Sequence, residues 1–157
     1  WIMGIKIKET VKSPLKKVMG SNKVQVGWFG ETGKTMMLAS IFEGKANPGG
    51  RNHNIIVPAW KPLEAAAPEI ENQAINIIKR EAANMILNGK EETLKKIALK
   101  GAEELKKTVE EIKSPGNKPG TIKQKGFDNP MIRSGNFKRS ASGKVNGVGT
   151  FGKGKLG

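Results

Sequence analysis

The amino-acid sequence predicts an α+β fold: a small antiparallel sheet packed against two long amphipathic helices, with extended loops and a basic C-terminal arm. Three observations lead to this prediction. Segments near the N-terminus alternate apolar and polar residues, which is typical of half-buried strands. Two long central segments repeat apolar residues at helical spacing on one face only, so each helix can cover the other and a sheet. The length of 157 residues suits one domain.

The first sixty residues are expected to hold two strands and two short helices. Residues 3–10 and 23–29 alternate in the manner of strands. A short helix is expected over 13–19, because it opens with Ser-Pro, a preferred N-cap followed by Pro at the first helical position. A second short, apolar helix is expected over 36–42. Residues 45–54, rich in Asn, Pro, Gly and Arg, are expected to form a loop.

The two long helices follow, and each is closed by a helix-breaking residue. Gly89 ends the first helix, which is about 25 residues or roughly 37 Å long, and Ser114-Pro-Gly ends the second. The residues expected on their apolar faces are Leu63, Ala66, Ile70, Ala74, Ile77, Ile78, Ala82, Met85 and Ile86 in the first, and Leu94, Ile97, Ala98, Gly101, Leu105, Val109 and Ile112 in the second.

The remaining chain is expected to be loop-like. We divide the molecule into an α+β core over 1–113, a loop and strand over 114–145 that completes the sheet or reaches a neighbour, and a flexible Gly/Lys-rich tail over 146–157. The strand is placed near 137–145. Segment 114–157 is almost without acids and short of apolar anchors, so we expect it to depend on assembly for its order.

The formal net charge of +14 favours a polyanionic partner, either nucleic acid, an acidic membrane surface or an acidic protein. The acids concentrate between Glu64 and Glu111, and beyond Glu111 only Asp128 remains. No apolar run reaches the roughly 20 residues needed to span a bilayer, so no membrane-spanning segment is expected. A membrane is not among the partners that we expect.

No catalytic, cofactor or metal site is expected. The chain has no Cys and a single His, His53, which excludes thiolate sites and sites that need two imidazoles. The carboxylate pairs Glu91–Glu92, Glu103–Glu104 and Glu110–Glu111 are adjacent in helices, so they point about 100° apart and do not converge on a substrate. Ser134, although followed by Gly135, lacks the G-x-S-x-G pattern and the His partner of a nucleophile.

The stretch Gly30-Glu-Thr-Gly33-Lys34-Thr35 invites comparison with a phosphate-binding P-loop, but its spacing argues against one. A P-loop has four residues between its first Gly and the Gly-Lys-Thr, so that backbone N–H groups wrap the phosphates. Counting back from Gly33 places Trp28 where that Gly belongs, and Gly27 lies one residue too far. We therefore expect a turn here, with neither ATP nor GTP bound.

Basic and apolar residues of the C-terminal arm are the candidate contacts with a partner. Phosphate contact needs no motif, but no helix-turn-helix, zinc finger or RNP-type signature supports sequence-specific reading. The candidates for contact with a neighbouring subunit or with DNA in a channel are Lys118, Lys123, Lys125, Phe127, Met131, Ile132, Arg133, Phe137, Lys138 and Arg139.

Five stretches, in order, resemble the tail-completion and virion-morphogenesis (neck) proteins of tailed bacteriophages. They are Val24-Gln-Val-Gly27, Leu38-Ala-Ser-Ile-Phe-Glu-Gly44, Val57-Pro-Ala59, Ala98-Leu-Lys-Gly101 and the run from Lys125-Gly126 through Pro130-Met-Ile-Arg-Ser-Gly-Asn-Phe-Lys-Arg-Ser140. The chain departs from the family pattern where Phe42 and Glu43 are exchanged and where Trp60-Lys61-Pro62 replaces Arg-Pro. The similarity covers roughly residues 22–145, and the order of the stretches carries it.

The resemblance implies a non-enzymatic virion protein that forms a ring, usually six-fold, at the head–tail junction or tail end, after assembly in the host cytoplasm. Its expected partners are copies of itself, connector or adaptor, tail terminator and tail-tube proteins, and genome DNA in the lumen. The main alternative is a basic nucleic-acid-binding protein of ribosomal or nucleoid type. A nucleotide-dependent enzyme is a third, resting only on the failed P-loop comparison.

Overall fold

The computed structural model describes residues 3–7, 22–29, 33–45 and 57–155. The helix expected over 13–19, His53 and most of the loops expected between 30 and 56 lie outside these residues. The described elements are β1 (Met3–Ile7), β2 (Val24–Trp28), α2 (Gly33–Phe42), α3 (Pro62–Asn88), α4 (Glu91–Glu111), α5 (Pro119–Lys125), α6 (Asn136–Ser140), β3 (Ser142–Val145) and β4 (Val148–Phe151).

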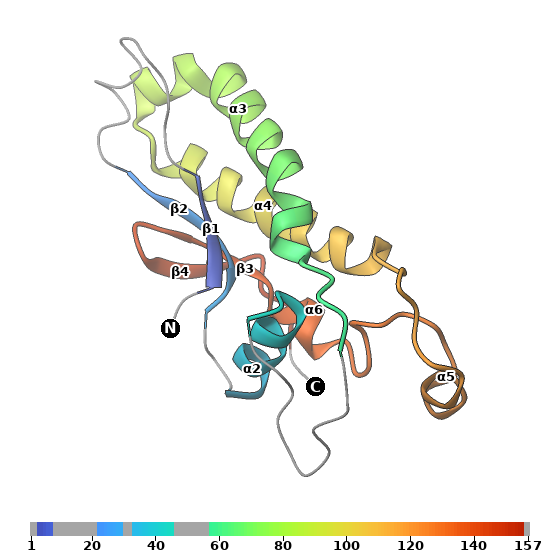
Figure 1. Cartoon of the computed structure of the whole chain (residues 1–157). Helices are drawn as coiled ribbons and strands as arrows, with labels where there is room; N and C mark the ends of the chain where they lie inside the picture. Colours follow the sequence, from blue (N-terminus) through green and yellow to red (C-terminus); the bar gives the residue numbers. More distant parts are fainter. Residues whose placement is uncertain (1–2, 8–21, 30–32, 46–56, 156–157) are drawn as a thin grey trace.

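The strands form one antiparallel sheet in the order β1-β2-β3-β4. Helix α4 contacts β2 and β3, and α3 lies against α4 (Figure 1). Helices α2 and α6 pack together at one end of the sheet, whereas α5 stands away from the body (Figure 1). The expected α+β fold, with a small antiparallel sheet against two long helices, is therefore confirmed.

The apolar faces of α3 and α4 form most of the core, largely as their periodicity predicts. Ile70, Ile77, Leu105 and Val109 are all buried. Ile86 is the exception, because its side chain is 66 % exposed. It follows the buried Met85 by one position, which turns it about 100° away from the stripe that faces α4.

The prediction of a strand over 137–145 is wrong for the first half of that segment. Residues Asn136–Ser140 form α6, and only Ser142–Val145 form β3. Gly135, which has a φ of 78°, turns the chain into α6 so that Phe137 enters the core. There its ring stacks on Trp28 with centroids 4.3 Å apart.

The tail expected to be flexible over 146–157 contains β4, which pairs with β3. Asn146 and Gly147 connect the two strands, with φ angles of 51° and 77°. An Asn-Gly pair with positive φ at both positions is the favoured two-residue hairpin turn, because its twist matches that of the strands. The Asn146 backbone N–H also donates to the Lys23 carbonyl at 2.7 Å. This dipeptide is a sequence signal from which the hairpin could have been predicted in place of a flexible tail.

Candidate functional site: a basic projection and the cleft at its base

Residues 113–130, which we name the α5 projection, include no buried residue. Every residue of α5 is exposed or half-buried, and the helix stands clear of the body in Figure 1. The projection carries Lys113, Lys118, Lys123 and Lys125 against one acid, Asp128. It is therefore a positively charged protrusion.

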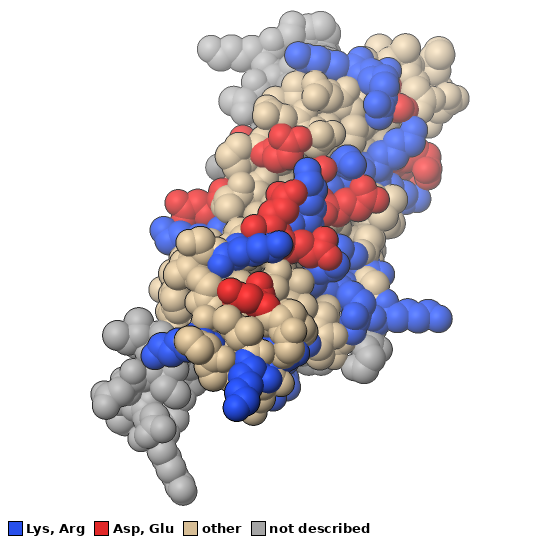
Figure 2. Space-filling view, turned by 90° about the vertical axis from the view of Figure 1, so that its right-hand side faces the viewer, with Lys and Arg blue, Asp and Glu red and all other residues tan. Residues whose placement is uncertain are grey.

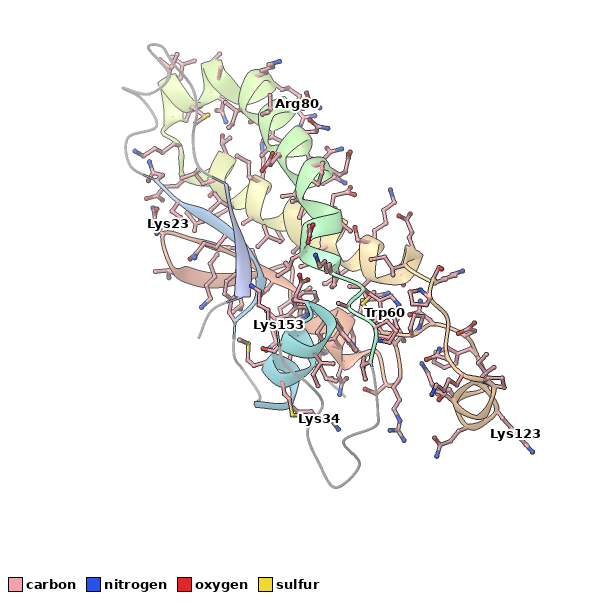
Figure 3. All side chains as sticks on the ribbon, viewed as in Figure 1. Lys23, Lys34, Trp60, Arg80, Lys123 and Lys153 are labelled. Atoms are coloured by element: carbon pink, nitrogen blue, oxygen red, sulfur yellow. The ribbon has the colours of Figure 1, made fainter. Side chains whose placement is uncertain are left out.

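Local signals in the sequence explain why α5 forms. Pro119 occupies the first turn, where its fixed φ suits a helix, and Gly126 ends the helix in the left-handed region at a φ of 80°. Lys123 and Lys125 lie in the last turn, where positive charge favours the negative end of the helix dipole. The side chain of Lys123 points away from the body (Figure 3).

Hydrogen bonds fasten the base of the projection. The Trp60 indole N–H donates to the Pro115 carbonyl at 2.9 Å. Asn129 donates through its side-chain amide to the Glu110 carbonyl at 3.0 Å, at the end of α4. These contacts join both ends of the projection to the body.

A carboxylate closes the projection on itself. One oxygen of Asp128 accepts from the Asn117 backbone N–H at 2.9 Å and from its side-chain amide at 2.8 Å. The backbone hydrogen bond is the main cause that lowers the pKa of Asp128 below its ordinary value. The projection is thus a loop closed by its own hydrogen bonds. The sequence analysis did not predict this, because it expected the segment to depend on assembly for its order.

The ten candidate contact residues separate into two groups. Met131 and Phe137 are buried in the core, and Ile132 packs against it, which corrects their assignment as anchors for a neighbour. Lys138 pairs with Glu110, and the Arg139 guanidinium donates to Ser134 and Asn136 of the same chain. The five that lie on the accessible surface of the projection or beside it are Lys118, Lys123, Lys125, Phe127 and Arg133.

Phe127 gives the projection an apolar point. Its side chain is 42 % exposed, and the Lys125 ammonium lies 5.0 Å from its ring centroid. Such a cation–aromatic pair holds both groups in place while leaving ring surface free.

A cleft of about 790 Å³ separates α2 from the projection and the segment that follows it. Lys34, Lys125 and Arg133 contribute cations to its lining. Among the described residues that line it, none is acidic. Burial is the main cause that lowers the pKa of Lys125, whose ammonium also donates to the Asn129 carbonyl.

The rest of the visible surface differs from this region. Acidic and basic side chains are interspersed over the upper and middle parts of the face shown in Figure 2. On α3 and α4 they form ion pairs such as Lys96–Glu81 at 3.0 Å and Lys100–Glu103 at 3.3 Å. No cluster of His, Asp or Glu able to hold a metal ion occurs in the described part of the chain.

The P-loop comparison is only partly covered by the structure. Gly33, Lys34 and Thr35 form the first turn of α2, and the loop before them lies outside the described residues. The absence of nucleotide binding therefore stays a prediction.

Comparison with protein-family models, with curated proteins and with solved structures finds no match. None of the described helices is both long and apolar enough to cross a bilayer. The exposed lysines, the ring of Phe127 and the cationic cleft are chemically suited to binding an anionic partner.

Proposed function

We propose that this protein is a structural virion protein of a tailed bacteriophage, which forms a ring, six-fold by the resemblance, at the neck or tail end and there joins or completes the tail. The observation that carries the proposal is the α5 projection. It is a positively charged protrusion that hydrogen bonds hold at its base. Within the described part of the chain, its helix has no buried residue. A protrusion of this kind is suited to a heterologous, head-to-tail contact, which generates a ring when the rotation between subunits closes.

The residues behind the family resemblance support the proposal through their structural roles. The Glu43 carboxylate accepts from the Leu63 backbone N–H at 2.7 Å and so caps the start of α3. Met131 and Phe137, from the best-matching run, fill the core below the projection. Two of the stretches that resemble the phage family thus contribute a helix cap and core residues to this fold.

The proposed neighbours are further copies of the chain, connector or adaptor proteins, the tail terminator or the tail tube, with genome DNA in the lumen. The alternative is a nucleic-acid-binding protein of ribosomal or nucleoid type, which the charge of +14 favours. Against it, the acids and bases of the long helices largely neutralise each other, whereas a dedicated binder more often carries its charge on a helix or sheet face.

The test is a reconstruction of intact particles from the phage genome that encodes the chain, with mass spectrometry of the same particles. The proposal expects the protein at the neck or tail end, in a ring. Lys118→Glu/Lys123→Glu, which reverses charge on the projection, should fail to complement a deletion, whereas Lys79→Glu/Arg80→Glu on α3 should complement. Absence of the protein from purified particles would overturn the proposal.

A further inference from the structure

We propose that the cleft between α2 and the α5 projection binds an acidic peptide segment of a different protein, with carboxylates on the cations of its rim and apolar side chains on its floor. The inference rests on the proposed function for the partner's place in the virion. Its test uses the isolated chain, so the two can fail separately.

The rim is cationic from both sides. Lys34 lies in the first turn of α2, which contains no acidic residue, so the positive end of the helix dipole adds to its charge. Lys125 and Arg133 face the same cleft from the other side. Carboxylates placed between them would form charge-assisted hydrogen bonds, which are stronger than neutral ones.

The floor is apolar. Leu38 of α2 and Pro130 of the opposite segment are half-buried and offer apolar surface to the cleft, and the buried Phe42, Met131 and Phe137 lie behind them. A nucleic-acid backbone presents phosphates and sugars, and would leave these side chains without apolar partners. A peptide can place carboxylates on the rim and a Leu or Phe on the floor. The volume of about 790 Å³ lies within the range of sites that enclose a ligand.

A second copy of this chain is a poor source for the acidic segment. Most acids of α3 and α4 already pair with cations of their own subunit, so docking them elsewhere would break existing pairs. The acids with such partners are Glu64, Glu81, Glu92, Glu103, Glu104, Glu110 and Glu111. The charge balance therefore favours a different, acidic protein.

Fluorescence anisotropy on the full chain tests the proposal. The probe is a labelled synthetic peptide that alternates Glu and Leu, measured at physiological ionic strength beside a labelled DNA duplex. Lys34→Gln/Arg133→Gln should weaken peptide binding roughly tenfold or more. Lys79→Gln/Arg80→Gln, which removes the same charge at the far end of α3, should leave it unchanged; Figure 3 shows Arg80 and Lys34 at opposite ends of the molecule.

Leu38→Asn separates the two kinds of anionic partner. It should weaken binding of the peptide and leave binding of DNA unchanged, because only the peptide has an apolar group for the floor. Equal loss in the two double variants would show diffuse attraction and overturn the proposal. Three other results would also overturn it. They are peptide binding that Leu38→Asn leaves unchanged, a loss of binding in Lys34→Gln/Arg133→Gln that affects DNA and not the peptide, and binding of ATP that Lys34→Ala abolishes.

Discussion

At the scale of single residues, four aromatic side chains from distant parts of the sequence attach the C-terminal third to the body. Trp28 stacks on Phe137, Phe42 meets Phe137 edge-on at 4.9 Å, and Phe42 meets Trp60 edge-on at 5.6 Å. The Trp28 indole N–H also donates to the Phe137 carbonyl at 2.9 Å. The alternation in β2 predicts a buried Trp28, but no local pattern shows that its partner lies 109 residues later.

Close backbone approach gives the first prediction at this scale. A Cβ at Gly143 would lie 2.4 Å from the Ala98 carbonyl oxygen, where β3 meets α4. Gly143→Ala is therefore expected to lower the free energy of unfolding by about 1–3 kcal/mol, as overpacking does. Urea unfolding measures it. Gly120→Ala is the control, because a Cβ there meets nothing within 4 Å; equal midpoints for the two variants would refute the close contact.

The Glu43 carboxylate gives a prediction about pH. Burial, the largest cause, raises its pKa above the ordinary value, despite the opposing hydrogen bond from Leu63. The folded state then binds this proton more tightly than the unfolded state. The contribution of Glu43 to stability is therefore present below the ordinary Glu pKa and is lost as the pH rises through the raised one.

Glu43→Gln keeps an oxygen that can accept from Leu63 and removes this titration. As the pH rises from 4 to 7, the free energy of unfolding of Glu43→Gln should increase relative to that of the unmodified chain. Glu43→Ala, which lacks the acceptor, should have a free energy of unfolding about 0.5–2 kcal/mol lower than the unmodified chain at pH 7. Denaturant unfolding at both pH values measures the difference. A Gln variant that loses stability, relative to the unmodified chain, as the pH rises would contradict the assignment.

At the scale of elements, a helix or strand could be predicted where its own residues show a long apolar periodicity or a clear cap. The long helices α3 and α4 carry apolar faces over many turns, so their positions and most of their buried residues follow from the sequence. Helix α6 has only five residues, too few to show a helical repeat in the sequence, and its Phe137 stacks on Trp28 from a distant part of the chain. The sequence predicted only a basic loop where the projection lies. The hydrogen bonds that hold the projection in place involve Trp60 and Asn117, whose partners are distant in sequence.

Helix packing gives the prediction at this scale. Leu105 is fully buried on α4, within the core cluster that includes Val26 and Ile70. Leu105→Ala should cost about 2–5 kcal/mol of unfolding free energy, because it removes buried methyl groups and leaves a cavity. Leu99→Ala on the same helix is the control, since Leu99 is 40 % exposed. A Leu105→Ala midpoint close to that of Leu99→Ala would show that this face of α4 is not core.

At the scale of the whole molecule, charge and packing are distributed unequally. The body holds the sheet, the paired charges of α3 and α4, and the aromatic contacts, whereas the α5 projection holds four lysines against one acid and the exposed ring of Phe127. The chain beyond the projection belongs to the body, because Met131, Phe137, β3 and β4 take part in the core or the sheet. Of segment 114–157, we therefore expect only residues 114–130, within the projection, to gain protection on assembly.

Limited trypsin digestion tests this division of the molecule. In the isolated chain, the earliest cuts in the C-terminal third should follow Lys123 and Lys125, since α5 buries no residue within the described chain. Lys138 and Lys144 should resist, because they lie in α6 and β3 against the body. In the assembled particle the two α5 sites should also resist, because a neighbour would cover them. Equal resistance of α5 in both states would show that the projection needs no partner, and cleavage at Lys144 before Lys123 would show that the C-terminal strands are not part of the folded body.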